Sequence, residues 1–168
     1  TAVSRFTANL VQKEMMLSNS INVIYNGVDH TLFIPKIPNQ NQKQTNKLNV
    51  LFCGNLTRRK GMQWIMPIIK RLDRNINIVY TSGLRSSGML PDHPQLRCLG
   101  SVLYHDMPTV YQNADILLFP TVREGFGLAA AEAMSCGLPV VATDCSSLPE
   151  LIDDGKGGFL CPLGDVDV

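Results

Sequence analysis

Charge is scarce in this sequence, and the signatures of several protein classes are missing. Only 17% of the 168 residues are charged, and 15 Lys and Arg against 14 Asp and Glu leave a formal net charge of +1. This balance gives no support for binding nucleic acid or a membrane surface through overall charge. No stretch has the pattern of a signal peptide or the length of a membrane-spanning helix. We therefore expect a cytoplasmic domain, with any membrane association left to parts of the protein outside this chain.

Paired cysteines and clustered metal ligands are missing as well. No CxxC pair occurs and the His residues stand alone, so the spacing predicts neither a zinc site nor a disulfide framework. No cluster of carboxylates or His residues suggests a catalytic metal, and no G-x-S-x-G elbow suggests hydrolase chemistry. We interpret the five cysteines as buried thiols in a reducing cytosol: Cys53, Cys98, Cys136, Cys145 and Cys161.

Apolar residues, at 45% of the chain, form continuous runs separated by helix-like segments. The runs predict strands at 21–25, 48–54, 76–80, 97–100, 115–120 and 138–143. The intervening segments predict helices over 4–17, 61–73, 105–114, 127–137 and 147–155, the first capped by Ser4. Residues 34–47, rich in Asn, Gln, Lys and Pro, indicate a loop or linker. Apolar strands alternating with helices predict an α/β fold with a Rossmann-like parallel sheet and helices on both faces.

Ligands of such folds bind where loops leave the carboxyl ends of the strands, and the loop before the helix at 127–137 carries the strongest motif. Gly125 and Gly127 allow a ligand to approach the backbone closely. The amides of Phe126, Gly127 and Leu128 lie at the positive end of the helix dipole, which predicts an anion site suited to a diphosphate.

Two glutamates flank this anion site. A carboxylate would repel phosphate, so each glutamate should bind uncharged hydroxyl groups. Glu132 is expected about two turns into the helix, roughly 10 Å from its start, which matches the distance from a diphosphate to its ribose. Glu124 lies on the other side, where a sugar would bind. The alternatives are an ordinary acidic residue at a helix start and a solvated helix residue.

A second loop, after the strand at 48–54, is basic. Lys60 would neutralise phosphate at the start of the next helix, and Arg58 or Arg59 would add bidentate contacts. The alternative for these three residues is a solvated basic turn.

The segment from Glu124 to Glu132, E-G-F-G-L-A-A-A-E, resembles the E-x7-E signature of the retaining glycosyltransferase family 4, also called group 1. Four further blocks resemble the family in the same order, so the likeness covers essentially the whole chain. They are VIYNGVD at 23–29, CGNLTRRKG at 53–61, the surroundings of the motif at 113–143, and LPELIDDGKGGFL at 148–160.

The resemblance implies a GT-B fold, in which two Rossmann-like domains face a cleft. Residues 48–168 would form the C-terminal, donor-binding domain without its last helices. Residues 1–33 would be the tail of the N-terminal, acceptor-binding domain and the crossing between the domains. The implied reaction moves a sugar from a nucleoside-diphosphate sugar to a glycan or lipid acceptor, with no cofactor and no metal, and needs the missing N-terminal domain. The sugar, the base and the acceptor stay open.

The resemblance also assigns roles to residues. The first motif glutamate, Glu124, would contact the hydroxyls of the donor sugar and form the catalytic pair with Lys60, which holds the diphosphate. The second, Glu132, would contact the ribose, and backbone groups of Gly100 and Val102 the nucleobase. The expected donor-binding residues are Asn55, Arg59, Lys60, Gly100, Val102, Glu124, Gly125, Phe126, Gly127, Leu128 and Glu132.

The sequence departs from the family pattern at two places. Asn55 stands where the family usually has a phosphate-binding Arg, and either Arg58 or Arg59 is a candidate to replace it. Ser146 and Ser147 stand where two glycines are usual, which makes close backbone approach to a ligand harder.

Two rival functions remain open. Residues 125–130 also fit the G-x-G-x-x-A fingerprint of an NAD-dependent oxidoreductase, and Asp144 follows after a strand. However, that fingerprint turns directly off its strand, whereas residues 121–124 intervene here, and it explains neither glutamate nor the basic loop. The other rival is a non-catalytic nucleotide-binding module, because fold does not fix function.

Overall fold

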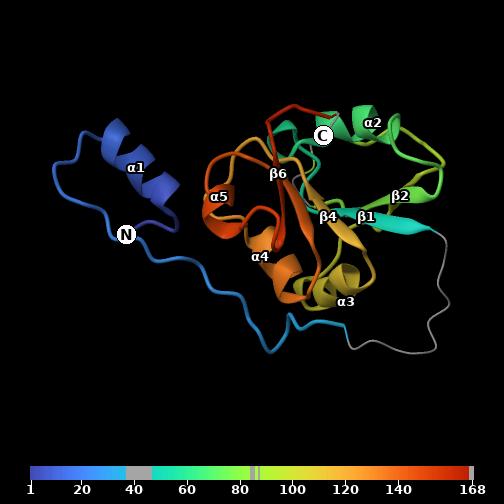
Figure 1. The fold of residues 1–168 in the computed structure, drawn as a ribbon, viewed down its shortest axis with the longest axis horizontal. Coiled ribbons are helices and arrows are strands. Elements are labelled where there is room, and N and C mark those ends of the chain that lie inside the picture. The colour runs from blue at the N-terminus through green and yellow to red at the C-terminus, as the bar shows by residue number, and fades with distance from the viewer. Residues whose placement is uncertain (37–46, 84–85, 87, 167–168) are drawn as a thin grey trace.

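A computed structural model describes residues 1–36, 47–83, 86 and 88–166 and shows a six-stranded sheet in the order β3-β2-β1-β4-β5-β6 (Figure 1). Every neighbouring pair is parallel. The strands are β1 Leu48–Phe52, β2 Ile76–Tyr80, β3 Leu96–Cys98, β4 Ile116–Phe119, β5 Val140–Thr143 and β6 Gly158–Cys161. Helices flank the sheet, so the predicted Rossmann-like α/β fold is confirmed.

Each predicted helix is present but shorter than the pattern suggested. The helices are α1 Arg5–Glu14, α2 Met62–Ile69, α3 Met107–Gln112, α4 Leu128–Ser135 and α5 Leu148–Leu151, with 3-10 turns at η1 Arg58–Lys60 and η2 Tyr104–Asp106. The predicted cap of the first helix is confirmed, because the side chain of Ser4 accepts the N–H of Thr7.

Two strand predictions were wrong. Residues 21–25 form only an isolated bridge between Val23 and Ala2, because no sheet edge lies beside them to pair with a full strand. The sixth strand, β6, was missed, since its four residues follow a glycine-rich turn and begin with glycine. Gly158 fits there because a side chain would collide with β5, its Cβ lying 2.2 Å from the carbonyl oxygen of Val140.

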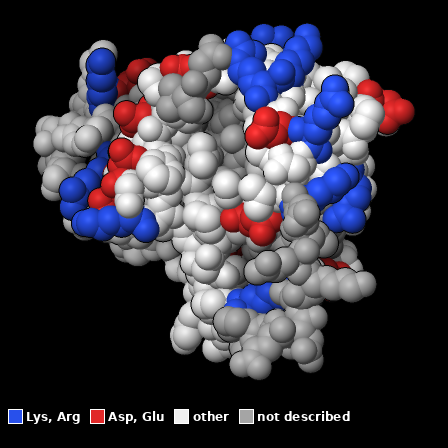
Figure 2. Space-filling model, turned by 45° about the vertical axis from the view of Figure 1, so that its right-hand side comes forward, with Lys and Arg blue, Asp and Glu red and all other residues white. Residues whose placement is uncertain are grey.

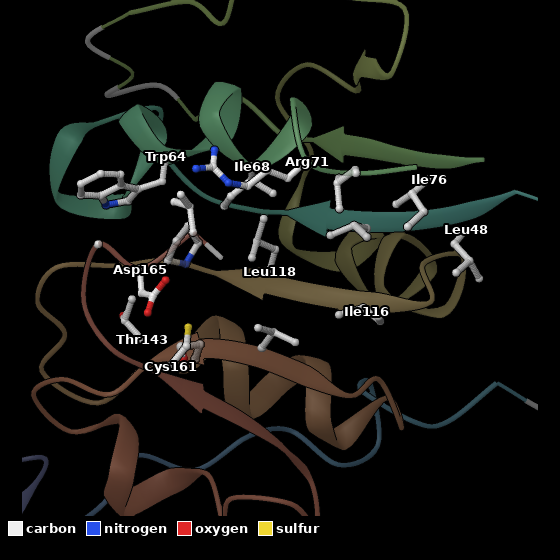
Figure 3. Close-up of a pocket in the computed structure, with 17 residues that line it drawn as sticks. Leu48, Trp64, Ile68, Arg71, Ile76, Ile116, Leu118, Thr143, Cys161 and Asp165 are labelled. Carbon is white, nitrogen blue, oxygen red and sulfur yellow. The ribbon is translucent and has the colours of Figure 1, made fainter. Parts of the chain in front are cut away.

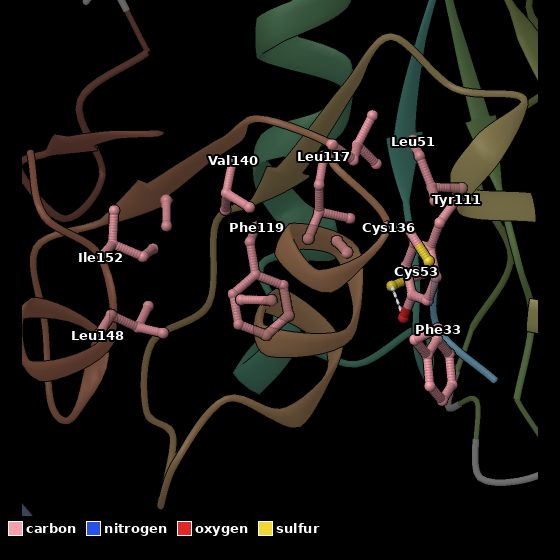
Figure 4. Packing of buried hydrophobic residues seen from close by; sticks show 14 residues of the cluster. Phe33, Leu51, Cys53, Tyr111, Leu117, Phe119, Cys136, Val140, Leu148 and Ile152 are labelled. Atoms are coloured by element: carbon pink, nitrogen blue, oxygen red, sulfur yellow. Dashed lines mark hydrogen bonds between the residues drawn. The ribbon is translucent and has the colours of Figure 1, made fainter. Parts of the chain in front are cut away.

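An apolar cluster covers each face of the sheet, because successive strand residues point to opposite faces. Leu51, Leu117 and Val140 pack toward α3, α4 and α5 (Figure 4). Their strand neighbours, such as Phe52, pack against Ile65 of α2 on the other face.

The segment before the predicted linker belongs to the first of these clusters. Phe33 is 1% exposed and lies beside Tyr111 of α3. Its carbonyl accepts the hydroxyl of Ser135 at 2.7 Å, and the carbonyl of Ile34 accepts the side-chain amide of Gln112 at 2.8 Å. The approach to the linker is therefore fixed on α3 and α4, whereas residues 37–46 lie outside the described residues.

An apolar groove of about 490 Å³ runs along the face of the sheet that carries α2 (Figure 3). Trp64 and Ile68 of α2 line one side, and Leu118 and Val141 form part of its floor. None of the expected donor-binding residues lines it. In the described part of the chain, no helix combines the length and hydrophobicity that a membrane crossing requires.

Candidate functional site

Two loops meet at the carboxyl ends of β1 and β4, which are neighbours in the sheet. The carbonyl of Arg59 in η1 accepts the N–H of Val122 at 2.8 Å and the hydroxyl of Thr121 at 3.0 Å. Gly61 makes this approach possible: it has a positive φ of 86°, and a Cβ there would lie 1.9 Å from the carbonyl oxygen of Pro120. The sheet thus joins two motifs that are far apart in sequence.

Lys60 and Glu124 form an ion pair where these loops meet. Nζ of Lys60 lies 2.6 Å from Oε1 of Glu124, and the side chains are only 16% and 9% exposed. The hydroxyl oxygen of Thr121 lies 2.9 Å from the same carboxylate oxygen, and the ammonium lies 5.1 Å from the ring centroid of Phe119. Shielding from water strengthens the pair and makes it costly to leave either charge alone.

The start of α4 offers unpaired backbone donors beside this ion pair. Gly127 caps the helix with a positive φ of 98° and no side-chain cap. Within the described residues, the N–H groups of Phe126, Gly127 and Leu128 donate no hydrogen bond. Because these groups lie at the positive end of the helix dipole, they form a ready site for an anion.

Glu132 lies nearer the helix start than expected. The helix begins at Leu128, so Glu132 is about one turn along it, roughly 6 Å rather than two turns. The hydroxyl of Tyr111 donates to its Oε2 at 3.0 Å. Burial raises the pKa of Glu132 above its ordinary value, and the bond from Tyr111 lowers it only in part.

The other expected donor-binding residues are more scattered. Nη1 of Arg59 donates to the carbonyl of Arg123 at 3.4 Å, so its guanidinium lies along the Glu124 loop. Oδ1 of Asn55 lies against the backbone after β2, 2.0 Å from where a Cβ of Gly83 would be. Gly100 follows β3, and its carbonyl accepts the N–H of Ser82 at 2.9 Å.

Val102 is half-buried in the same loop after β3. This loop shares the carboxyl edge of the sheet with the site, but β1 and β2 separate it from β4. Residues 84, 85 and 87, between β2 and β3 in the sequence, lie outside the described residues.

Sequence reasoning missed several supporting residues. Thr121 is fully buried and bonds Glu124; its position directly after a strand-ending proline was the available signal. The hydroxyl of Ser147 donates to the carbonyl of Glu124 at 3.3 Å, so the serine pair that departs from the family pattern braces this loop. In this arrangement Ser146 adopts a left-handed φ of 56°, a region that residues other than glycine rarely occupy. Tyr111 had no signal, because a tyrosine at helical spacing is usually a core residue.

The N-terminal helix lies beside the glycine loop and α5 (Figure 1). The carboxylate of Glu150 accepts the N–H groups of Arg5 and Phe6 at 2.8 and 2.7 Å, which caps α1 from another part of the chain. The hydroxyl of Thr7 donates to the carbonyl of Gly125 at 3.2 Å. The residues before the linker therefore touch the loop that carries the motif.

Figure 2 shows Lys and Arg side chains on one face in several groups, with Asp and Glu among them. All five cysteines carry free thiols, but the prediction that all of them are buried was wrong. Cys53 and Cys136 are buried and Cys145 and Cys161 are half-buried, whereas Cys98 is exposed because it lies on the edge strand β3. In the part of the chain that the structure describes, no three His, Cys, Asp or Glu side chains gather into a metal-binding group.

Known proteins similar to this chain include several that are named as glycosyltransferases. An uncharacterized 41.2 kDa protein from the cps region of Klebsiella pneumoniae is 32% identical over an alignment of 158 residues, with 89% of this chain and 43% of that protein covered. The D-inositol 3-phosphate glycosyltransferase of Corynebacterium kroppenstedtii is 30% identical over 164 residues, with 83% of this chain and 36% of that protein covered. The chain spans less than half the length of these relatives.

Solved structures agree in fold. Anabaena HepE in complex with UDP and glucose superposes with a TM-score of 0.82 at 21% identity, covering 98% of this chain and 49% of that chain. The outer core galactosyltransferase WaaB superposes with a TM-score of 0.74 at 21% identity, covering 99% and 49%. The fold is thus that of one half of a GT-B glycosyltransferase. A family model described as glycosyl transferases group 1 matches residues 47–168, and the chain belongs to that family.

Proposed function

We propose that this chain binds the nucleoside-diphosphate sugar of a retaining glycosyltransferase as its C-terminal, donor-binding domain. One observation carries the proposal: the Phe119 ring contacts both the ammonium of Lys60 and the cap residue Gly127, which brings the unpaired amides at the start of α4 close to the shielded pair of Lys60 and Glu124. A diphosphate needs such donors and a cation, and a sugar needs a carboxylate that accepts its hydroxyls.

Each part of the donor has a place in this arrangement. Lys60 and the amides of Phe126, Gly127 and Leu128 hold the diphosphate and stabilise the charge that develops on it as the sugar leaves. Glu124 accepts hydroxyls of the sugar and Glu132 those of the ribose. To reach phosphate, Lys60 exchanges part of its contact with Glu124 for the anion, so the ion pair keeps the ammonium in place until the donor arrives.

The nucleobase is proposed to lie at Gly100 and Val102, with Asn55 and Arg59 at the edge of the phosphate site. Anabaena HepE has been solved with UDP-glucose, which makes uridine nucleotides the first probes. The reducing cytosol is the proposed location, in keeping with five free thiols.

A thermal-shift panel of UDP, GDP, ADP, their sugars and NAD tests the proposal. Nucleoside diphosphates and their sugars should raise the melting temperature more than NAD does. Stabilisation by NAD alone would overturn the proposal in favour of an oxidoreductase. The geometry already favours the sugar nucleotide, because β4 ends at Phe119, well before Gly125, and the dinucleotide fingerprint allows no such loop.

We propose further that donor binding by this chain is not sufficient for transfer. The chain spans 43% of one relative and 36% of another, and transfer requires an acceptor held in near-attack geometry. The purified chain should bind the donor with negligible turnover, whereas a protein that also contains a preceding acceptor domain should transfer the sugar. Transfer at equal rates by both would support a self-sufficient domain, and donor binding without transfer by either would support the non-catalytic module.

Retention and independence from metal are parts of the same proposal. Lys60 and the helix start supply the positive charge that a metal would otherwise bring to the leaving diphosphate. With the longer protein, proton NMR of the first product should show the anomeric configuration of the donor. A chelator should leave turnover unchanged, and loss of turnover that added Mg²⁺ restores would refute metal independence.

A further inference from the structure

A buried tyrosine anchors the second glutamate of the motif. Tyr111 is 1% exposed, and its ring centroid lies 6.1 Å from that of Phe33 in the core (Figure 4). Its hydroxyl lies 3.0 Å from Oε2 of Glu132 and 3.7 Å from Sγ of Cys53. The carboxylate of Glu132 is therefore attached to a side chain whose position close packing fixes.

The hydrogen bonds in this chain of side chains run in one direction. A phenol has a single proton, and Tyr111 gives it to the carboxylate, so the thiol of Cys53 donates to the phenol oxygen. Burial raises the pKa of Cys53 to about 11 and raises the pKa of Tyr111 above its ordinary value, so both groups keep their protons near neutral pH. The end of β1 is thereby linked to α3 and α4.

We propose that Tyr111 is a positioning residue for nucleotide recognition, which turns the carboxylate of Glu132 so that it accepts both hydroxyls of the ribose. This inference rests on the proposed function. Among the described residues, Oε1 of Glu132 has no hydrogen-bond partner, so it is open to a ligand. A carboxylate that is oriented before binding loses less rotational freedom when the ribose arrives.

A positioning role differs from a purely structural one in which ligands it affects. A hydrogen bond that only held α3 against α4 would change the affinity for all nucleotides equally. A residue that orients Glu132 toward the ribose acts only on nucleotides that carry the ribose hydroxyls.

The test compares Tyr111→Phe with the unchanged chain by calorimetry. The probes are UDP, GDP and ADP and, for the one that binds best, its analogue without both ribose hydroxyls. Tyr111→Phe keeps the ring in the core and removes one hydrogen bond to a charged group, so the ribonucleotide should bind roughly tenfold more weakly. The analogue should bind about equally well to both proteins. Tyr80→Phe, which removes a hydroxyl from the other core cluster, is the matched control and should change neither affinity.

A double variant and a pH series sharpen the test. On a Glu132→Gln background, Tyr111→Phe should have no further effect, because both act through one contact. Tyr111 lowers the pKa of Glu132, so Tyr111→Phe should move the loss of ribose-dependent binding to a higher pH as the solution is acidified. An unchanged midpoint would mean that Tyr111 does not bond the carboxylate that binds the ribose, and would overturn the inference.

The outcomes separate the inference from the function on which it rests. If no nucleoside diphosphate binds the unchanged chain, both fail. If the unchanged chain prefers the ribonucleotide and Glu132→Gln abolishes that preference, but Tyr111→Phe keeps it or weakens both ligands equally, only the inference fails. If Tyr111→Phe does not fold, Cys53→Ala takes its place, because it leaves the phenol present and should weaken only the ribonucleotide.

Discussion

The two ends of the site hold the same acidic side chain in opposite ways. The carboxylate of Glu124 pairs with the ammonium of Lys60 at 2.6 Å, whereas that of Glu132 accepts the neutral hydroxyl of Tyr111 at 3.0 Å. A cation stabilises a buried carboxylate much more strongly than a phenol does. At the Glu132 end, burial raises the pKa of the carboxyl above its ordinary value.

Because of this difference, we expect the two ends of the site to respond differently when a ligand binds. The charged end can exchange its internal partner for a phosphate, because an ammonium binds either anion. The neutral end keeps its partner when the ligand binds, because the phenol points at the carboxylate from inside the core. The contact between Lys60 and Glu124 can therefore rearrange when a ligand binds, whereas the contact between Tyr111 and Glu132 stays fixed.

The largest effect should come from Lys60→Met, which removes the cation and keeps much of the apolar stem. It leaves Glu124, only 9% exposed, without its cation, so the free energy of unfolding should fall by about 3 kcal/mol. Affinity for a nucleoside diphosphate should fall roughly 100-fold, because charged contacts to phosphate are lost. Urea unfolding and calorimetry measure the two quantities.

The double variant Lys60→Met with Glu124→Gln is the control for this experiment. It should regain part of the stability without regaining phosphate binding, since the unpaired charge is gone but the cation is still missing. Normal stability of the single variant would mean that the pair behaves as a solvent-exposed one.

Substituting Glu132 and Glu124 one at a time should lower the affinity for different ligands, which distinguishes the two ends of the site. Glu132→Gln should weaken a nucleoside diphosphate and its sugar alike, about tenfold or more, because both carry the ribose. Glu124→Gln should weaken only the nucleotide sugar, and it frees Lys60 for the phosphate. Isothermal calorimetry with UDP and UDP-glucose makes the comparison. Equal weakening of both ligands by Glu124→Gln would assign Glu124 a purely structural role.

A third glutamate sharpens the contrast through pH. Desolvation alone would raise the pKa of Glu150, but the amides of Phe6 and Arg5 outweigh it and the pKa lies below its ordinary value. A lowered pKa stabilises the contact above the unfolded value of about 4.3, and that contribution is lost as the pH falls through the folded value. Amide NMR signals of α1 should therefore shift cooperatively in the acid range below about pH 4.

Glu150→Ala should produce the undocked α1 spectrum already at neutral pH, with little change in the sheet. Retention of the docked spectrum in this variant would show that contacts such as that of the Thr7 hydroxyl with the carbonyl of Gly125 suffice to hold α1.

The smallest effect is expected from Ser146→Gly, which touches only the Glu124 end. Ser146 has a φ of 56°, and glycine adopts this region without strain but is more flexible when unfolded, so stability should rise by about 0.5 to 1 kcal/mol. Ser147 keeps its bond to Glu124, so nucleotide affinity should not change. A loss of stability in urea would mean that the strain is compensated by contacts of the serine side chain.

The sheet was largely readable from the sequence, including the edge strand β3, but the other edge strand, β6, was not. Buried central strands such as β1 and β4 are continuous apolar runs, and this pattern survives without knowledge of their neighbours. The edge strand β6 depends on a partner, since Gly158 has no side chain to carry a pattern. Residues 21–25 show the reverse case, an apolar run with no sheet beside it.

The residue types of the site could be predicted from the sequence, but the contacts between these residues could not. The glycine loop and the basic loop each have a local signal, yet the bond between Lys60 and Glu124 spans 64 positions and depends on β1 and β4 being neighbours. The bond from Tyr111 to Glu132 likewise needs the packing of α3 on α4. Neither of these two contacts can be read from the spacing of residues along the sequence.

The docking of Phe33 sets an order of events during protein synthesis. Its carbonyl is bound by Ser135, which is made 102 residues later. At about 5 to 20 residues per second, the ribosome needs roughly 5 to 20 seconds to supply that partner. During this interval the side chain of Phe33, which is 1% exposed in the folded protein, has no complete apolar pocket to pack into. This early segment therefore completes its folding late, once α4 has left the ribosome, and is an apolar stretch that chaperones can bind in the meantime.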